Sequence, residues 1–257
     1  MPRPAPKSEE AVAKLNELWR SARRYYDEGD WRVRQVAKLG NQLLKSHAAS
    51  GWHILAGVYA LTGDVRSAIE SADKALRLSA DPAIIIGKAT ALSNLGYFSE
   101  AGRILREALS VDLLPFSKIG EKTIATGTIL ALDEALKGAG NMQTAVRDPL
   151  RKATAIAASI LRENNVTDED IGSWLDVAGQ IMRESRFFFI DYPILFVTTE
   201  EDFPQVDLSF IVDVDPEQGA ELNLALVERC VHAEVIPPEC FSFGFRSNPE
   251  LNERIAA

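Results

Sequence analysis

Three carboxylates near the C-terminus have the spacing that comes closest to a metal site. Asp207, Asp213 and Asp215 alternate with apolar residues over 206–215, so on a strand all three side chains share one face. Paired carboxylates of this kind can hold magnesium. The alternative interpretation is structural, because Asp215 precedes a proline at a helix start and Asp213 keeps a solvated strand face polar. We favour the structural interpretation, so the sequence predicts no metal and no cofactor.

The histidines and cysteines form no recognisable catalytic pattern. None of the three histidines has a second histidine at metal-ligand spacing. Cys230 and His232 are two residues apart on a predicted helix, so they point about 200° apart and cannot form a dyad. Two cysteines are too few for a disulfide framework and fit a reducing cytoplasm. We expect a cytoplasmic, non-enzymatic protein; an enzyme with a metal-dependent acidic site near the C-terminus is the alternative.

Charge is divided unevenly along the 257 residues, whose formal net charge is −9. Residues 187–257 hold 14 acidic and 3 basic side chains, whereas residues 1–186 hold 23 acidic and 25 basic ones. A net-acidic chain is a poor candidate for binding nucleic acid or an anionic membrane. No window offers the run of about 18 apolar residues that a membrane span needs. The acidity suits a basic protein partner instead.

One segment keeps nucleic-acid binding open as an alternative. Residues 14–45 hold 8 basic and 4 acidic side chains, with four aromatic residues among them: Trp19, Tyr25, Tyr26 and Trp31. Basic residues interleaved with aromatics can bind single strands by charge and stacking. The other interpretation is that the aromatics are core residues and the arginines a solvated face. The charge of the whole chain favours this second interpretation.

The elements that must position these residues begin with a long helical part. From residue 8 to residue 186, alanine and leucine recur at three- and four-residue spacings, which predicts helices separated by short breaks. Segments 52–78 and 85–111 superpose after a shift of 33 residues, which aligns Gly63 with Gly96. Glycine at both positions lets the chain reverse tightly between two helices. Further helices are predicted over 117–137, 141–163 and 168–184.

The two superposed segments resemble tetratricopeptide repeats. The matched positions are Trp52, Leu55, Ala56, Tyr59, Gly63, Ala68, Ala75 and Leu76 in the first segment, and Gly96, Tyr97, Ala101, Ala108 and Leu109 in the second. The resemblance implies stacked antiparallel helix pairs, with an earlier, degenerate unit over 19–45 in which Tyr25 takes a first-helix position.

In that family the first helices commonly line a concave groove that binds peptides. Carried over position by position, the resemblance implies a groove formed by His53, Leu61, Ile86, Thr90 and Asn94. Members that clamp a terminal carboxylate present a basic pair there, and this chain lacks it. An apolar or helical ligand therefore suits the implied groove better.

The last part of the chain changes from a helical to an alternating pattern. Strands are predicted over 187–199 and 206–215, then a helix that Asp215 caps and that runs to about Val231, then a strand over 240–246. The expected fold class is mostly α. A tetratricopeptide-like antiparallel helical-repeat array over 8–186 precedes a small α+β domain over 187–257, in the order strand–strand–helix–strand.

These patterns predict a scaffold or adaptor that recognises a protein partner by shape and charge. The expected contact residues are the five groove residues together with Asp207 and Asp213 on the acidic strand face. A specific version is an inhibitory partner, such as an immunity protein or antitoxin, whose acidic face blocks a basic toxin or nuclease. Charge complementarity of that kind speeds association with a basic protein.

Overall fold

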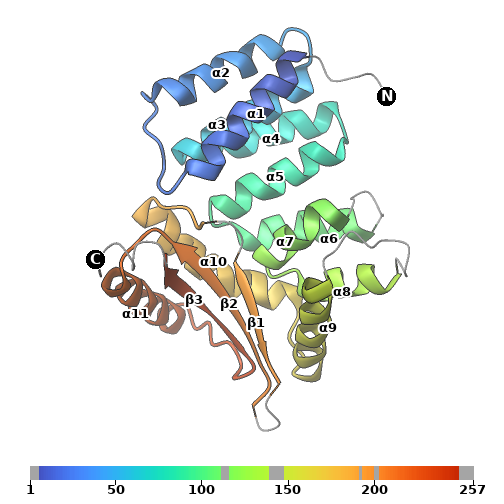
Figure 1. The fold of residues 1–257 in the computed structure, drawn as a ribbon, viewed down its shortest axis with the longest axis vertical. Helices are drawn as coiled ribbons and strands as arrows, with labels where there is room; N and C mark the ends of the chain where they lie inside the picture. Colours follow the sequence, from blue (N-terminus) through green and yellow to red (C-terminus); the bar gives the residue numbers. More distant parts are fainter. Residues whose placement is uncertain (1–5, 111–115, 139–147, 191–192, 200–202, 249–257) are drawn as a thin grey trace.

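The computed structural model describes residues 6–110, 116–138, 148–190, 193–199 and 203–248. Its helices are α1 (Pro6–Ser21), α2 (Trp31–Leu43), α3 (Ala48–Thr62), α4 (Val65–Leu78), α5 (Pro82–Asn94), α6 (Phe98–Ser110), α7 (Phe116–Ala125), α8 (Ile129–Gly138), α9 (Asp148–Glu163), α10 (Asp168–Ser185) and α11 (Pro216–His232). Its strands are β1 (Ile194–Thr198), β2 (Gln205–Val212) and β3 (Phe241–Ser247). Figure 1 shows the first helices stacked in sequence order, with the sheet beyond them. The predicted fold class, a mostly α helical array followed by strand–strand–helix–strand, is confirmed.

Two glycine turns set the spacing of the helix pairs in the array. Gly63 follows α3 with φ +79°, and Gly96 follows α5 with φ +71°, both in the left-handed region that glycine enters without strain. After the first turn, the Asp64 side chain accepts a hydrogen bond of 3.0 Å from the backbone N–H of Ser67 and caps α4. The shift of 33 residues between these glycines therefore marks equivalent helix hairpins.

A third glycine turn corrects the expected long helix over 117–137. Gly127, with φ +70°, separates α7 from α8. The turn packs closely against α10, because a Cβ atom on Gly127 would lie 2.3 Å from Cγ2 of Ile171. The start of the helix expected over 141–163 lies outside the described residues, and the helix expected over 168–184 is confirmed as α10.

The link between α1 and α2 differs from the degenerate repeat unit expected over 19–45. Tyr25, expected on a first helix, lies instead in a non-helical segment after α1. The backbone N–H of Tyr25 donates to the carbonyl oxygen of Arg186 at 3.0 Å, and that of Phe188 donates to Arg23 at 2.9 Å. The start of the array is thus paired with the segment that follows α10, about 160 residues later in the sequence.

The three consecutive phenylalanines that were expected to begin a strand over 187–199 connect two cores instead. Phe188 packs among the first helices, with its ring centroid 5.2 Å from that of Trp19. Phe187 and Phe189 point the other way and contact Phe245 at 5.7 Å and Phe210 at 5.6 Å. The alternation is that of an extended chain, but the strand β1 itself begins only at Ile194.

The C-terminal sheet has the order β1-β2-β3, with β1 antiparallel and β3 parallel to β2. Helix α11 supplies the crossover that the parallel pair requires. One face of the central strand is buried, formed by Val206, Leu208, Phe210 and Val212. This face belongs to a hydrophobic core that it shares with helices of the array from α5 to α10. The division into two domains at residue 187 stays a prediction.

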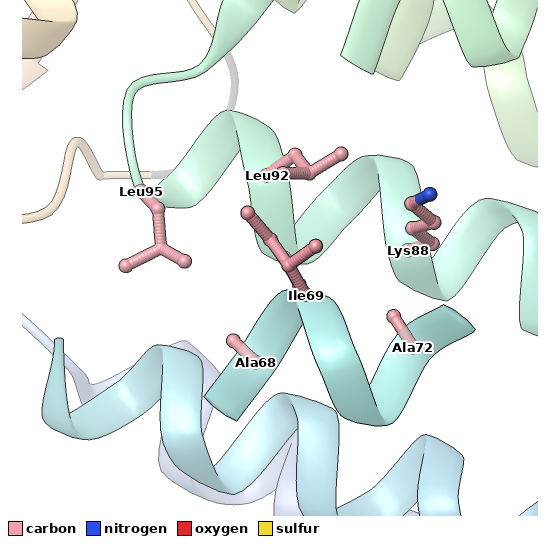
Figure 2. A pocket seen from close by; sticks show the side chains of 7 residues that line it. Ala68, Ile69, Ala72, Lys88, Leu92 and Leu95 are labelled. Carbon is pink, nitrogen blue, oxygen red and sulfur yellow. The ribbon is translucent and has the colours of Figure 1, made fainter. Parts of the chain in front are cut away.

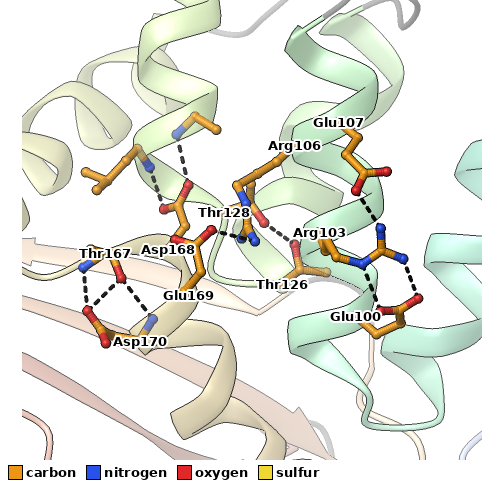
Figure 3. A network of polar contacts seen from close by, with 12 residues as sticks. Glu100, Arg103, Arg106, Glu107, Thr126, Thr128, Thr167, Asp168, Glu169 and Asp170 are labelled. Carbon is orange, nitrogen blue, oxygen red and sulfur yellow. Dashed lines mark hydrogen bonds and ion pairs between the residues drawn. The ribbon is translucent and has the colours of Figure 1, made fainter.

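Helix α10 carries two carboxylates that cap other helices. Asp168 accepts hydrogen bonds from the backbone N–H groups of Leu130 and Ala131 at the start of α8, at 2.8 and 3.0 Å, as Figure 3 shows. Two turns later, Asp176 accepts from the backbone N–H groups of Phe98 and Ser99 at the start of α6, at 2.6 and 3.1 Å. A carboxylate at a helix N-terminus satisfies free donors and complements the helix dipole.

The same helix also contacts the turn between α5 and α6. Arg183 donates to the carbonyl oxygens of Leu95 and Gly96, at 3.1 and 2.5 Å. Gly96 lies directly against Gly179, and a Cβ atom on Gly96 would be 2.4 Å from the Gly179 Cα atom. Helix α10 therefore touches the start or end of three helices of the array.

Removing the cap at α6 tests this anchoring role. We expect Asp176→Ala to lower the free energy of unfolding by about 2–3 kcal/mol, since two backbone donors lose their acceptor. Asp27→Ala, an exposed carboxylate in the link after α1, serves as the control and should change it by less than about 0.5 kcal/mol. Urea denaturation of both variants provides the measurement. Equal effects of the two substitutions would contradict the role of Asp176.

Candidate functional site

The carboxylate of Asp207 lies within a polar network on the open face of the sheet. It accepts hydrogen bonds from Ser209 Oγ at 2.5 Å and Ser242 Oγ at 2.9 Å. The Arg246 guanidinium lies 3.4 Å away, and the same side chain covers the ring of Phe196, 4.7 Å from its centroid. Because a cation is already beside Asp207, the acidic strand face that the sequence predicts is partly neutralised.

The other two carboxylates of the proposed metal site have separate structural roles. Asp213 follows β2, and its Oδ1 atom accepts from Asn248 Nδ2 at 3.3 Å. Asp215 caps α11 by accepting from the backbone N–H of Gln218 at 2.8 Å, as the sequence predicts. Six residues of nearly extended chain put Asp207 roughly 20 Å from Asp213. Within the described ranges, no three His, Cys, Asp or Glu side chains are placed to hold one metal ion.

The implied groove is largely filled at its α3 side. Leu61 is fully buried and packs in the core of the first helices, so it does not line an accessible surface. His53 is half-buried with its ring against Gly87 of α5, where a Cβ atom would lie 1.9 Å from the imidazole Cε1. Burial lowers the pKa of His53. These two residues hold helices of the array together.

The implied groove residues on α5 are only partly accessible. Ile86 is half-buried against the larger core, and Asn94 is half-buried at the end of α5. Thr90 Oγ1 donates to the Ile86 carbonyl oxygen at 2.8 Å and accepts from Lys122 Nζ of α7 at 2.6 Å. Burial lowers the pKa of Lys122 to about 8. Partner binding by the groove residues stays a prediction.

A hollow between α4 and α5 is too tight to serve as a ligand site. Figure 2 shows its apolar walls, with Lys88 at one end. The lining residues are Ala68, Ile69, Ala72, Lys88, Ala91, Leu92 and Leu95, and the space between them does not admit a water molecule. Lys88 Nζ is paired with Asp73 Oδ1 at 2.7 Å. The hollow is a seam of helix packing.

The aromatic residues of the basic N-terminal segment serve mainly in packing. Trp19 and Tyr25 stack on Phe188, and burial raises the pKa of Tyr25 to about 12. Tyr26 lies under the guanidinium of Arg32, whose Cζ atom is 5.0 Å from the ring centroid. Trp31 differs, since 71% of its surface is exposed. The stacking surface that single-stranded nucleic acid would need is therefore reduced to one side chain in this segment.

The outward face of α11 is a surface that the sequence did not single out. Leu224 is 66% exposed, Val227 62% and Val231 66%, and Ile236 just beyond the helix is 82% exposed. Their spacing places the three helical residues on one side of α11, together with the exposed Ala220. Large apolar side chains that gather on one helix face mark an interaction site more often than isolated ones do.

Contacts on its inner side hold α11 in place. Leu226 is buried in the larger core. The Asn223 side chain donates to the carbonyl oxygen of Phe245 and accepts from its N–H group, both at 2.8 Å. Arg229 forms a two-bond ion pair with Glu184 at the end of α10, with one bond of 2.9 Å. The outward apolar residues are therefore not needed to attach the helix.

Exposed carboxylates border the outward apolar residues. Glu217, Glu221 and Glu228 follow one side of α11, and all three are exposed. Within the described part of the chain, none of them forms a close ion pair, whereas Arg229 points to the opposite side and is already paired with Glu184. We name the set Ala220, Leu224, Val227, Val231, Glu217, Glu221 and Glu228 the α11 surface.

Sequence periodicity contained a signal for the α11 surface. Residues 216–232 carry two apolar sides, one with Leu222 and Leu226 and the other with Leu224 and Val227. A helix that is apolar on two sides has to bury both, and one side of α11 has no neighbour within the described residues. The pattern alone does not say which side faces the sheet.

Comparisons with known proteins do not assign the chain to a family. No family model matches the sequence, and no curated protein or solved structure matches it significantly. The resemblance to tetratricopeptide repeats therefore stays a prediction, although the helical array that it implies is present. None of the helices in the described ranges combines the length and the apolar composition required to cross a membrane.

Two leucines on α11 provide a matched test of which side is structural. Leu226→Ala should lower the free energy of unfolding by about 2–4 kcal/mol, because the side chain is buried. Leu224→Gln should change it by less than about 0.5 kcal/mol, because the side chain contributes little to the core. Urea denaturation compares them directly. A comparable loss for Leu224→Gln would show that the outward residues belong to the fold.

Proposed function

We propose that this chain acts by binding a basic protein partner and that the α11 surface is its main contact. The observation that carries the proposal is the exposed row of Leu224, Val227 and Val231 beside three exposed carboxylates. Burying Leu224, Val227, Val231 and Ile236 on a partner would contribute roughly 4–8 kcal/mol. Association itself costs about as much, so a useful affinity requires the charges as well.

Electrostatics supports a protein rather than a nucleic acid as the partner. Residues 187–257 carry 14 acidic and 3 basic side chains, and the carboxylates of α11 lie where a partner would approach. Nucleic acid would bring phosphates against these carboxylates and lose affinity. A basic protein gains from the same charges in its association rate and in its orientation.

The enzyme alternative loses the arrangement on which it depended. Asp207, Asp213 and Asp215 each make a hydrogen bond with a structural role, and Asp207 lies far along the strand from the other two. A binding function requires no such constellation. Within binding functions, an inhibitory partner of a basic toxin or nuclease fits the acidic surface, because blocking an enzyme needs coverage and tight association rather than chemistry.

Salt-dependent capture with charge-reversed chains tests this proposal. The immobilised full chain should retain a basic protein from an extract of the native host at about 50 mM NaCl and release it at about 500 mM. The double variant Glu221→Lys/Glu228→Lys should not retain that protein. A control with the same charge change, Asp27→Lys/Glu28→Lys, reverses two exposed carboxylates after α1 and should behave as the unaltered chain does.

Two results would count against the proposal. One is retention of the same proteins by all three chains, because the α11 carboxylates would then have no part in binding. The other is retention that does not change with salt, because a charge-steered interface is weakened by screening.

A further inference from the structure

We propose that the part of the partner that docks on the α11 surface is an amphipathic helix with basic residues beside its apolar stripe, lying along α11 as in a coiled coil. This inference rests on the proposed function and specifies the chemistry of its partner. Three features of the described residues carry it. They are the spacing of the apolar residues, the positions of the carboxylates and the covered edge of β3.

The exposed apolar residues follow the spacing of a coiled-coil seam. Ala220, Leu224, Val227 and Val231 are separated by four, three and four residues. This is the alternation of a and d positions in a heptad, which keeps one line of side chains facing a neighbouring helix. The line is about 16 Å long at the helical rise of 1.5 Å per residue. A straight apolar line of this length fits the matching stripe of a second helix.

The carboxylates occupy the positions that select a partner helix. With Leu224 as an a position, Glu221 and Glu228 both fall at e positions, directly beside the seam. The side chains on the other border are Asn223 and Cys230, which carry no charge that would balance them. Residues of a docking helix that face the e positions must therefore be Lys or Arg.

A second copy of this chain does not satisfy these charges. If two α11 helices paired antiparallel, Glu221 of one chain would face Glu228 of the other. If they paired parallel, the two Glu217 residues would meet at the seam, since this residue falls at an a position. Like charges at such positions are destabilising, so self-association through α11 is disfavoured.

An added β-strand does not suit this part of the molecule either. The Asn223 amide uses both the N–H and the carbonyl oxygen of Phe245, the groups that an extra strand beside β3 would need. A helix requires no free backbone groups and packs by side chains alone. The partner element is accordingly a helix and not an extended segment.

Two synthetic peptides test the inference against the full chain. Both are designed helices of 21 residues with leucine at a and d positions; one carries lysine at e and g, and the other carries glutamate there. Fluorescence anisotropy should show the lysine peptide binding about tenfold or more tightly than the glutamate peptide. Glu221→Lys/Glu228→Lys should reverse this preference, and Asp27→Lys/Glu28→Lys should leave it unchanged.

Substitutions in the seam separate docking from general charge attraction. Leu224→Asp should weaken binding of the lysine peptide about tenfold or more. Leu78→Asp replaces an exposed leucine of α4 and should have no effect. Circular dichroism checks that both variants remain folded.

Several outcomes would overturn the helix inference. Equal binding of the two peptides, or no effect of Leu224→Asp, would do so. Sedimentation that showed a dimer abolished by Leu224→Asp would assign the surface to a second copy. If the lysine peptide fails to bind while salt-sensitive capture through Glu221 and Glu228 persists, the helix inference is wrong and the proposed function stands. If both fail, the proposed function is wrong as well.

Discussion

Capping by helix α10 is the interaction on which the arrangement of the other elements depends. Asp168 satisfies the start of α8, Asp176 satisfies the start of α6, and Arg183 satisfies the end of α5. Buried helix ends without such partners are costly. Because these side chains are eight and seven residues apart, they lie on one face of α10 and fix both its position and its direction. Glu184, next along the helix, then binds Arg229 and sets the place of α11.

This arrangement explains why the acidic residues of the C-terminal part act at α11 and not at the strand face. The inner side of α11 is used by Leu226, by the amide of Asn223 and by the ion pair to Glu184. Its outer side is free to carry apolar residues that have no role in folding. On the sheet, by contrast, the nearby guanidinium of Arg246 offsets the charge of Asp207. The uncompensated carboxylates therefore border an apolar line, which is the combination that a basic amphipathic helix matches.

Local signals predicted much of the fold, whereas contacts between distant residues were beyond them. The turns at Gly63 and Gly96 followed from internal repetition, and the start of α11 followed from Asp215 before a proline. Gly127 was overlooked because helix formers surround it. The opposite directions of Phe187 and Phe188 depend on which cores lie to either side, and no local pattern encodes that.

The candidate site was harder to predict than the fold for the same reason. Asp207 reads as a free carboxylate until Arg246, 39 residues later, is placed beside it. Leu61 reads as a groove residue until the first helices cover it. The apolar row that includes Leu224 and Val227 reads as core until the structure shows that the other side of α11 faces the sheet. In each case tertiary packing decides exposure, and exposure decides which residues can bind.

Hydrogen–deuterium exchange on the full chain, with and without the captured basic partner, tests the central claim most directly. It compares the two surfaces within one experiment. If the α11 surface is the contact, amides of α11 exchange more slowly in the complex, and those of α3 and α5 are unchanged. Slower exchange confined to α3 and α5, with α11 unaffected, would return the binding site to the groove and contradict the account.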